Sequence, residues 1–362
     1  MDPDFRLSPE LCSGWRQAKQ SFAESRDDES EKYGNTMTNW RFDLVEAPAP
    51  GTVRRGHVAW GDPALGAWAF PYVAVNGTRP GPAVVVTAGY HGSEYPSIDA
   101  VVRLGATLDP ATVSGQILCL PLMNPQGFWE RAAYIVPADG LNLNRVFPGK
   151  PNGRVSERIA HHLFEKAIRK ADAYIDLHGG DLPESLLPFS IWFETGDQKT
   201  DAKSRAMAEA FGSPNLVVQR EAEMPIVGQA YTVAAKLGIP SFIAEDGEAG
   251  LHQDEASDRL LSGLQNVLRH LSALPGGARQ VKPPRHFARN AYVFAPEGGY
   301  FKPSVKLGDE IRAGQRLGRL TDFFGATVAE IVAPASGQVL YLIVNPAIAK
   351  GGLIGGVAVD PA

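Results

Sequence analysis

The stretch from residue 83 to about 271 alternates short apolar runs with longer amphipathic segments, and this alternation restricts the fold more than any other feature of the chain. The first of these runs, at 83–88, is rich in β-branched residues, which is typical of a strand buried on both faces of a sheet. The longer segments repeat apolar residues at helical spacing. Together they predict an α/β domain with helices on both faces of a largely buried sheet. Strands are expected at 83–88, 116–121, 173–178, 189–194, 215–219 and 240–244, and helices at 96–108, 153–171, 201–211, 228–237 and 255–272.

The flanking segments have a different texture. Alternating apolar residues within 56–76 predict antiparallel strands that open the main domain, and a polar helix is expected at 7–33. Near the other end, prolines and glycines indicate a linker, after which short β-type runs separated by glycines predict a small β-sandwich or barrel. The predicted division is an extension at 1–50, the main domain at 51–273, a linker at 274–284 and an all-β domain at 285–362.

Composition excludes several classes of function. The chain is 44% hydrophobic and 21% charged, which is ordinary for a soluble globular protein. A net charge of −5 offers no polycationic surface, so a nucleic-acid partner is not expected. No apolar run has the length of a membrane span, and the N-terminus lacks the pattern of a secretory signal. Two cysteines lie far apart, and Cys119 falls in an apolar strand, which favours a reducing, cytoplasmic location.

Two candidate metal ligands, His91 and Glu94, follow the strand expected at 83–88. Open α/β folds build their sites at the carboxyl ends of strands. An imidazole and a carboxylate three positions apart, just before a helix, are able to converge on one ion, and zinc accepts both ligand types. A His-x-x-Glu pair alone often arises by chance, so a third ligand has to come from elsewhere in the chain.

His178 is the candidate for that third ligand, because it ends the strand expected at 173–178. Asp176 lies two residues earlier on the same face of the strand and is suited to accept the other N–H of the imidazole. His161, His162 and His270 fall on predicted helices and are interpreted as surface or packing residues. The three candidate ligands predict a site for one zinc ion per chain.

Two further segments offer polar groups beside these ligands. A loop rich in Pro and Gly contains Asn144 and Arg145, and an Arg guanidinium is able to hold a substrate carboxylate through two hydrogen bonds. An ordinary surface loop is the alternative interpretation of such a pair. The strand at 240–244 leads into Glu245, whereas Asp246 and Glu248 are expected to be solvated.

Four patterns follow one another along the chain: His-x-x-Glu, Leu-Asn-Arg-x-Phe-Pro-Gly, Asp-Leu-His-Gly and a strand-terminal Glu. In this order they resemble the succinylglutamate desuccinylase and aspartoacylase family, within the wider zinc carboxypeptidase fold. The resemblance covers about residues 65–270 and implies that the main domain is a zinc-dependent deacylase domain with a mixed sheet. It implies zinc held by His91, Glu94 and His178, a substrate carboxylate held by Asn144 and Arg145, and Glu245 as general base and acid.

The sequence departs from the family pattern at two positions. Asn142 stands where the family loop usually has Asp, and Tyr134 stands where many members have an Arg. The nearest arginine is Arg131, which we take as a further candidate substrate-binding residue. Without the usual Arg, a small acyl group such as acetyl, including the acetyl group of an acetylated diamino acid, is favoured over an acidic one such as succinyl.

The C-terminal part resembles the β-domain that many such deacylases append, which is itself similar to biotinyl and lipoyl carrier modules. Carrier modules expose a Lys in a hairpin, but the corresponding residues 320–327 contain no Lys. A carrier role is therefore not expected. The domain is expected to pack beside the site or to join subunits, and a homo-oligomer stays open.

The expected activity is hydrolysis of the amide bond of a small N-acyl amino acid by metal-activated water, with Glu245 moving the protons. Two alternatives stay open. A zinc carboxypeptidase would instead cut the last residue from a peptide. A metal-binding protein without turnover would keep the ligands while Asn142 and Tyr134 mark a lapsed site.

Overall fold

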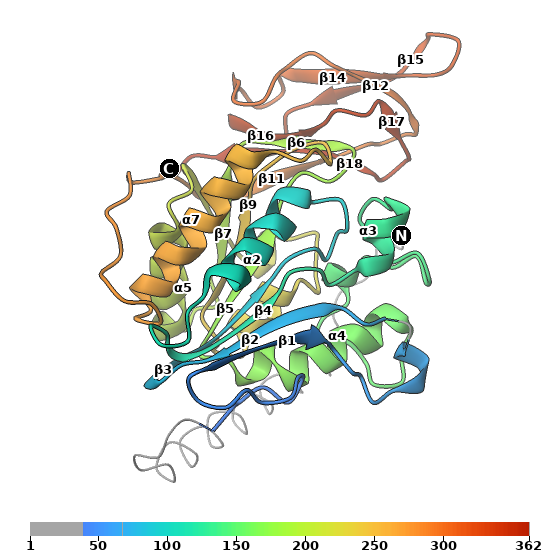
Figure 1. Cartoon of the computed structure of the whole chain (residues 1–362). Coiled ribbons are helices and arrows are strands. Elements are labelled where there is room, and N and C mark those ends of the chain that lie inside the picture. Colours follow the sequence, from blue (N-terminus) through green and yellow to red (C-terminus); the bar gives the residue numbers. More distant parts are fainter. Residues whose placement is uncertain (1–38, 67, 362) are drawn as a thin grey trace. The chain divides into compact units, whose positions relative to one another are not determined.

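The computed structural model describes residues 39–66 and 68–361, and the helix expected at 7–33 lies outside these residues. Within them, a nine-stranded mixed sheet forms the centre of the main domain, in the order β1-β2-β4-β3-β5-β9-β7-β8-β10 (Figure 1). The strands are β1 (Thr52–His57), β2 (Pro71–Asn76), β3 (Arg79–Thr87), β4 (Ser114–Leu120), β5 (Ala173–His178), β7 (Phe189–Phe193), β8 (Asn215–Gln219), β9 (Ser241–Glu245) and β10 (Arg285–Phe287).

The central strands β4, β3, β5 and β9 run parallel to one another, whereas β1, β2 and β7 make antiparallel pairs. β3 and β5 are buried almost without a break from Ala83 and Ala173 onward, because helices cover both of their faces. The free cysteine Cys119 is a buried residue of β4, as expected, and burial raises its pKa to about 12.

Helices cover the sheet on both sides. In Figure 1, α2, α5 and α7 lie on one side of the sheet and α4 lies on the other. Apolar residues of α2, α5 and α7, such as Leu104, Met207 and Leu264, share one buried cluster with Val84, Ile175 and other strand residues. The helices are α2 (Tyr95–Thr107), α3 (Pro125–Glu130), α4 (Val155–Lys166), α5 (Gln198–Phe211), α6 (Ala230–Lys236) and α7 (Asp254–His270), with short 3-10 turns η1 (Pro63–Leu65), η2 (Leu143–Arg145), η3 (Ile168–Lys170) and η4 (Glu221–Glu223).

The expected helix at 153–171 is interrupted. α4 ends at Lys166, Ala167 has non-helical angles of φ −131° and ψ −67°, and η3 follows. The chain then enters the sheet, where the N–H of Asp172 donates to the carbonyl oxygen of Ala83. Periodicity continues through the interruption because both pieces bury apolar side chains, so the sequence pattern does not reveal where the helix stops.

The C-terminal part forms two antiparallel sheets around an apolar core of their own, as expected for an all-β module. One sheet has the order β11-β18-β16-β13, and the other has the order β15-β14-β12-β17. The strands are β11 (Arg289–Phe294), β12 (Gly299–Pro303), β13 (Glu310–Ile311), β14 (Arg316–Thr321), β15 (Thr327–Val332), β16 (Gly337–Ile343), β17 (Ala347–Ile348) and β18 (Leu353–Val359).

Backbone pairing joins the all-β part to the main domain. The short strand β6 (Glu184–Leu186) lies between β5 and β7 in the sequence but pairs with β16. The N–H of Val344 donates to the carbonyl oxygen of Pro183, and the N–H of Leu187 donates to that of Leu340. Residues from Trp40 onward form one compact unit, and the domain boundary at 274–284 stays a prediction.

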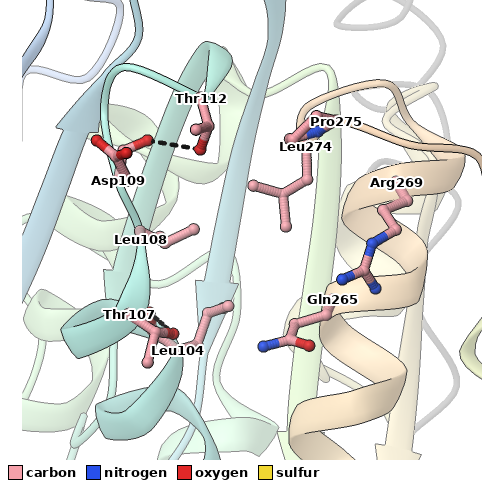
Figure 2. A pocket seen from close by; sticks show the side chains of 9 residues that line it. All are labelled: Leu104, Thr107, Leu108, Asp109, Thr112, Gln265, Arg269, Leu274 and Pro275. Carbon is pink, nitrogen blue, oxygen red and sulfur yellow. Dashed lines mark hydrogen bonds between the residues drawn. The ribbon is translucent and has the colours of Figure 1, made fainter.

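No helix in the described part of the chain combines the length and apolar character that crossing a membrane would require. A surface cavity of about 210 Å³ lies where the last turn of α2 meets the C-terminal end of α7 (Figure 2). α2 starts at the carboxyl edge of the sheet, so its last turn lies toward the opposite edge. The cavity is lined by Leu104, Thr107, Leu108, Asp109, Thr112, Gln265, Arg269, Leu274 and Pro275, none of which is a predicted site residue.

Candidate metal centre and active site

The predicted ligands lie at the carboxyl edge of three neighbouring parallel strands. His91 and Glu94 follow β3, His178 ends β5 and Glu245 ends β9. In the register of β5 and β9, His178 stands opposite Glu245. Parallel strands end at the same edge of a sheet, which is why side chains far apart in the sequence meet there.

The turn between His91 and Glu94 depends on a close approach of two backbones. A Cβ atom on Gly92 would lie 2.1 Å from the backbone nitrogen of Phe128 in α3. A side chain at this position would therefore push α3 away from the turn that carries both ligands.

Replacing Gly92 by Ala is accordingly expected to lower the free energy of unfolding by about 1–3 kcal/mol, because the inserted methyl group overpacks the turn. Urea denaturation measures this change. Gly277→Ala is the control, since a Cβ there meets open space, and it is expected to change stability by less than about 0.5 kcal/mol. Equal stability of the two variants would show that α3 moves aside freely.

Ligand atoms of His91, Glu94 and His178 lie within 4.8 Å of one another, and all three residues are buried. Nδ1 of His91 lies 2.5 Å from Oε1 of Glu94, and Nδ1 of His178 lies 2.9 Å from Oε2 of the same carboxylate. This Oε2 is buried without a hydrogen bond of good geometry. Two imidazoles and a carboxylate with an unsatisfied oxygen fit a divalent metal ion, so these residues form a candidate metal site.

The electrostatics of this triad favour positive charge between its members. Burial alone would raise the pKa of Glu94, but the two histidines outweigh burial and lower this pKa to about 2. Burial would likewise lower the pKa of His178, yet Glu94 and Asp176 raise it well above its usual value. A buried carboxylate that stays ionised is suited to hold a cation.

A second set of contacts orients the two imidazoles. Nε2 of His178 lies 3.4 Å from Oδ1 of Asp176 and 2.9 Å from Nδ2 of Asn144. Nε2 of His91 lies 3.1 Å from Oδ1 of Asn142, an oxygen that also accepts the N–H of Asn144. The amide oxygen of Asn142 thus gives His91 the acceptor that an Asp at this position would provide.

The substrate-binding candidates differ in their surroundings. Asn144 is buried, and its Oδ1 accepts the N–H of Ala230 at the start of α6. Arg145 is half-buried, and its Nη1 donates to the carbonyl oxygen of Asn144. Arg131 caps α3 with φ 53° and is exposed; within residues 39–66 and 68–361, no hydrogen bond or ion pair joins it to the triad.

Glu245 is half-buried at the end of β9. Burial raises the pKa of its carboxyl well above the usual value; nearby His178 lowers this pKa, and the carboxylates of Glu94 and Glu184 raise it further. A carboxyl with a raised pKa at the end of this strand is a candidate general base and acid.

Tyr134 lies in the site itself. Its ring stands edge-on to His91 with the ring centroids 5.4 Å apart. Its hydroxyl donates to Oε2 of Glu184 at 3.3 Å, and its N–H donates to Oδ2 of Asp181 at 2.7 Å. Tyr134 has φ 62°, a backbone conformation that is rare for residues other than Gly and that marks a constrained position.

Asp181 and Glu184 are residues that the sequence analysis missed. Asp181 is fully buried, and burial raises its pKa. Burial, followed by Glu94 and Asp181, raises the pKa of Glu184 to about 8. Asp181 could have been found from the sequence, because it follows the strand-terminal His178 by three residues. Glu184 could not, because β6 is too short to be recognised as a strand.

The expectation that the side chain of Asp246 is solvated is wrong. This side chain is buried, and Nε and Nη2 of Arg259 on α7 donate to its two carboxylate oxygens at 2.7 and 2.8 Å. The carboxylate also accepts the N–H of Gly247. The bidentate Arg explains why this charge is tolerated in a buried position.

The chain is similar to several known proteins. Over 272 residues the chain is 28% identical to the N-alpha-acetyl-L-2,4-diaminobutyric acid deacetylase of Halomonas elongata, covering 74% of this chain and 78% of the relative. The product-bound ectoine utilization protein EutE (DoeB) of Ruegeria pomeroyi superposes with a TM-score of 0.78 at 26% identity, covering 89% of this chain and 100% of that one.

A succinylglutamate desuccinylase/aspartoacylase of Rhodobacter sphaeroides superposes with a TM-score of 0.76 at 27% identity and covers the same shares of the two chains. The model of the succinylglutamate desuccinylase/aspartoacylase catalytic domain matches residues 80–271, the stretch that carries all of the predicted ligands and Glu245. The chain therefore belongs to the succinylglutamate desuccinylase/aspartoacylase family.

Proposed function

We propose that this protein is a zinc-dependent deacylase that hydrolyses the amide bond of a small N-acyl amino acid, with an acetylated diamino acid as the preferred substrate. The observation that carries the proposal is the buried triad of His91, Glu94 and His178 beside the strand-terminal Glu245. Family membership and the deacetylase from Halomonas elongata support the reaction type.

His91, Glu94 and His178 would hold the ion as its three protein ligands. When bound, zinc supplies Lewis acidity toward the acyl carbonyl and the attacking water. Asp176 and Asn142 keep the two imidazoles in the orientation that binding needs.

Glu245 moves the protons in this proposal. Its carboxylate takes a proton from the attacking water as the new C–O bond forms at the acyl carbon. The same group then gives that proton to the leaving nitrogen as the amide C–N bond breaks. The products are a carboxylic acid and an amine, so atoms and charges balance without a further reactant. Arg145, whose fork suits a carboxylate, is proposed to hold the carboxylate of the amino acid.

A panel of acyl groups on one amino acid tests the choice of acyl group. An acetyl derivative is expected to exceed the succinyl derivative in kcat/KM by about 10²–10³-fold, because Tyr134 offers no guanidinium that could pair with the succinyl carboxylate. Steady-state release of the free amine measures this ratio. A faster succinyl substrate would contradict the proposed acyl selectivity.

The same assay separates the two alternatives. Release of a C-terminal residue from dipeptides, without hydrolysis of acetylated amino acids, would favour the zinc carboxypeptidase. Bound zinc without hydrolysis of any N-acyl amino acid or dipeptide would favour the metal-binding protein without turnover.

A further inference from the structure

A wall of the candidate active site carries two carboxylates and a phenol hydroxyl. Oε2 of Glu184 accepts the hydroxyl proton of Tyr134, and Asp181 accepts two backbone N–H groups, those of Tyr134 and Leu182. The edge-on contact of Tyr134 with His91 sets this wall directly beside the triad. We call Tyr134, Asp181 and Glu184 the acidic wall.

The acidic wall has only distant cationic neighbours among the described residues. No Lys or Arg of this part of the chain forms an ion pair with Asp181 or Glu184, although His91 acts electrostatically on Asp181 and Arg145 on Glu184. The guanidinium of Arg145 lowers the pKa of Glu184, but burial and the neighbouring carboxylates raise this pKa by more. Keeping such carboxylates largely removed from water is costly unless a cation reaches them.

The backbone holds Glu184 in a fixed position. β6 starts at this residue and pairs with β16, where Glu184 stands opposite Ile343. The carbonyl oxygen of Glu184 also accepts the N–H of Ala249, in the loop that follows β9. A side chain carried by a strand with partners on both sides is better positioned for recognition than one on a free loop.

The name of a relative indicates what reaches the acidic wall. The deacetylase from Halomonas elongata acts, by its name, on N-alpha-acetyl-L-2,4-diaminobutyric acid, whose unacetylated side-chain amine is an ammonium group at neutral pH.

We propose that Glu184, together with Asp181 and the hydroxyl of Tyr134, binds the side-chain ammonium group of an N-acyl diamino acid and so determines which amino acid the site accepts. This inference rests on the proposed deacylase function. In this arrangement the acidic wall binds the ammonium group of the substrate, Arg145 holds its carboxylate, and the triad faces its acyl group.

Two substrates that differ by one amine test the proposal. N-acetyl-2,4-diaminobutyrate carries the ammonium group, and N-acetyl-2-aminobutyrate lacks it. The unmodified full-length protein is expected to favour the first in kcat/KM by about 10–100-fold, the range that a hydrogen bond to a charged group provides. Equal kcat/KM values for the two substrates in the unmodified protein would overturn the proposal without recourse to any variant.

Glu184→Gln is expected to lose most of this preference. The ratio of its kcat/KM for the cationic substrate to its kcat/KM for the neutral substrate should fall about 10–100-fold, because any effect of Glu184 on Glu245 is common to both substrates. Glu184→Asp, which keeps the charge, should retain part of the preference. Glu330→Gln, on the exposed strand β15, is the control and should match the unmodified protein on both substrates.

Equal losses on both substrates would mean that Glu184 has a merely structural role, and an unchanged preference in Glu184→Gln would place the ammonium group elsewhere. Either result overturns the inference while leaving the deacylase function intact. Failure of the unmodified protein to hydrolyse either substrate, or any member of the acyl panel, would instead overturn the proposed function and this inference with it.

Discussion

Replacing Glu245 by Gln is expected to lower kcat by about 10²–10⁴-fold, the contribution that a positioned general acid and base usually makes. Gln keeps the size of the side chain at the end of β9 but is unable to accept a proton from water or pass it to the leaving amine. The triad is untouched, so the zinc content should stay that of the unmodified protein. Single-turnover kinetics and metal analysis of the same sample measure both quantities.

Glu255→Gln is the matched control for this variant, because Glu255 is an exposed carboxylate in the first turn of α7. It should retain the full rate. A near-normal rate in Glu245→Gln would remove Glu245 from proton transfer. Loss of rate together with loss of metal would show that Glu245 acts through the stability of the site instead.

Removing the metal is expected to have the largest effect of all. Lewis acidity toward the acyl carbonyl is worth several kcal/mol, and each 1.36 kcal/mol corresponds to about tenfold in rate, so a chelated sample should lose at least about 10³-fold in kcat. Added zinc should restore the rate. His178→Ala should lose the same rate without recovery at ordinary zinc concentrations, because it removes one of three ligands.

His270→Ala controls for the general effect of deleting an imidazole. His270 is exposed at the end of α7, and its loss should change neither zinc content nor rate. A chelated sample that keeps its full rate would contradict a role for metal in the reaction. Zinc bound at full stoichiometry in His178→Ala would show that the ion is held by other residues.

The strands that carry the candidate site could be predicted because their signals are local. β3, β5 and β9 contain short apolar runs, and parallel strands of this kind end at one edge of the sheet. This geometry brings His178 and Glu245 opposite each other although 66 residues lie between them in the sequence. The predicted mixed α/β fold, the all-β C-terminal part and the family resemblance are confirmed.

The acidic wall could not be predicted, because it depends on pairing between distant segments. β6 has no apolar periodicity of its own, and its partner β16 comes about 150 residues later. Tyr134 was recognised as a departure from the family pattern, but its contacts with His91 and Glu184 follow from the path of the chain after α3. The substrate-binding roles of Asn144, Arg145 and Arg131 stay predictions. Of these three residues, Arg131 is exposed.

Charge was the other source of error. A run such as Asp246-Gly-Glu248 is polar, and polar runs at strand ends are usually solvated. Asp246 is nevertheless buried because Arg259, on a helix that follows in the chain, reaches it with two hydrogen bonds. A partner of this kind is fixed by helix packing and leaves no trace in the local sequence.

Anomalous diffraction at the zinc absorption edge, from crystals of the protein grown with zinc, would locate the ion. We expect one strong peak per chain at about 2.0–2.2 Å from a ring nitrogen of His91, a ring nitrogen of His178 and a carboxylate oxygen of Glu94. A map with no peak between these three side chains, or with its strongest peak at another place in the chain, would contradict this expectation.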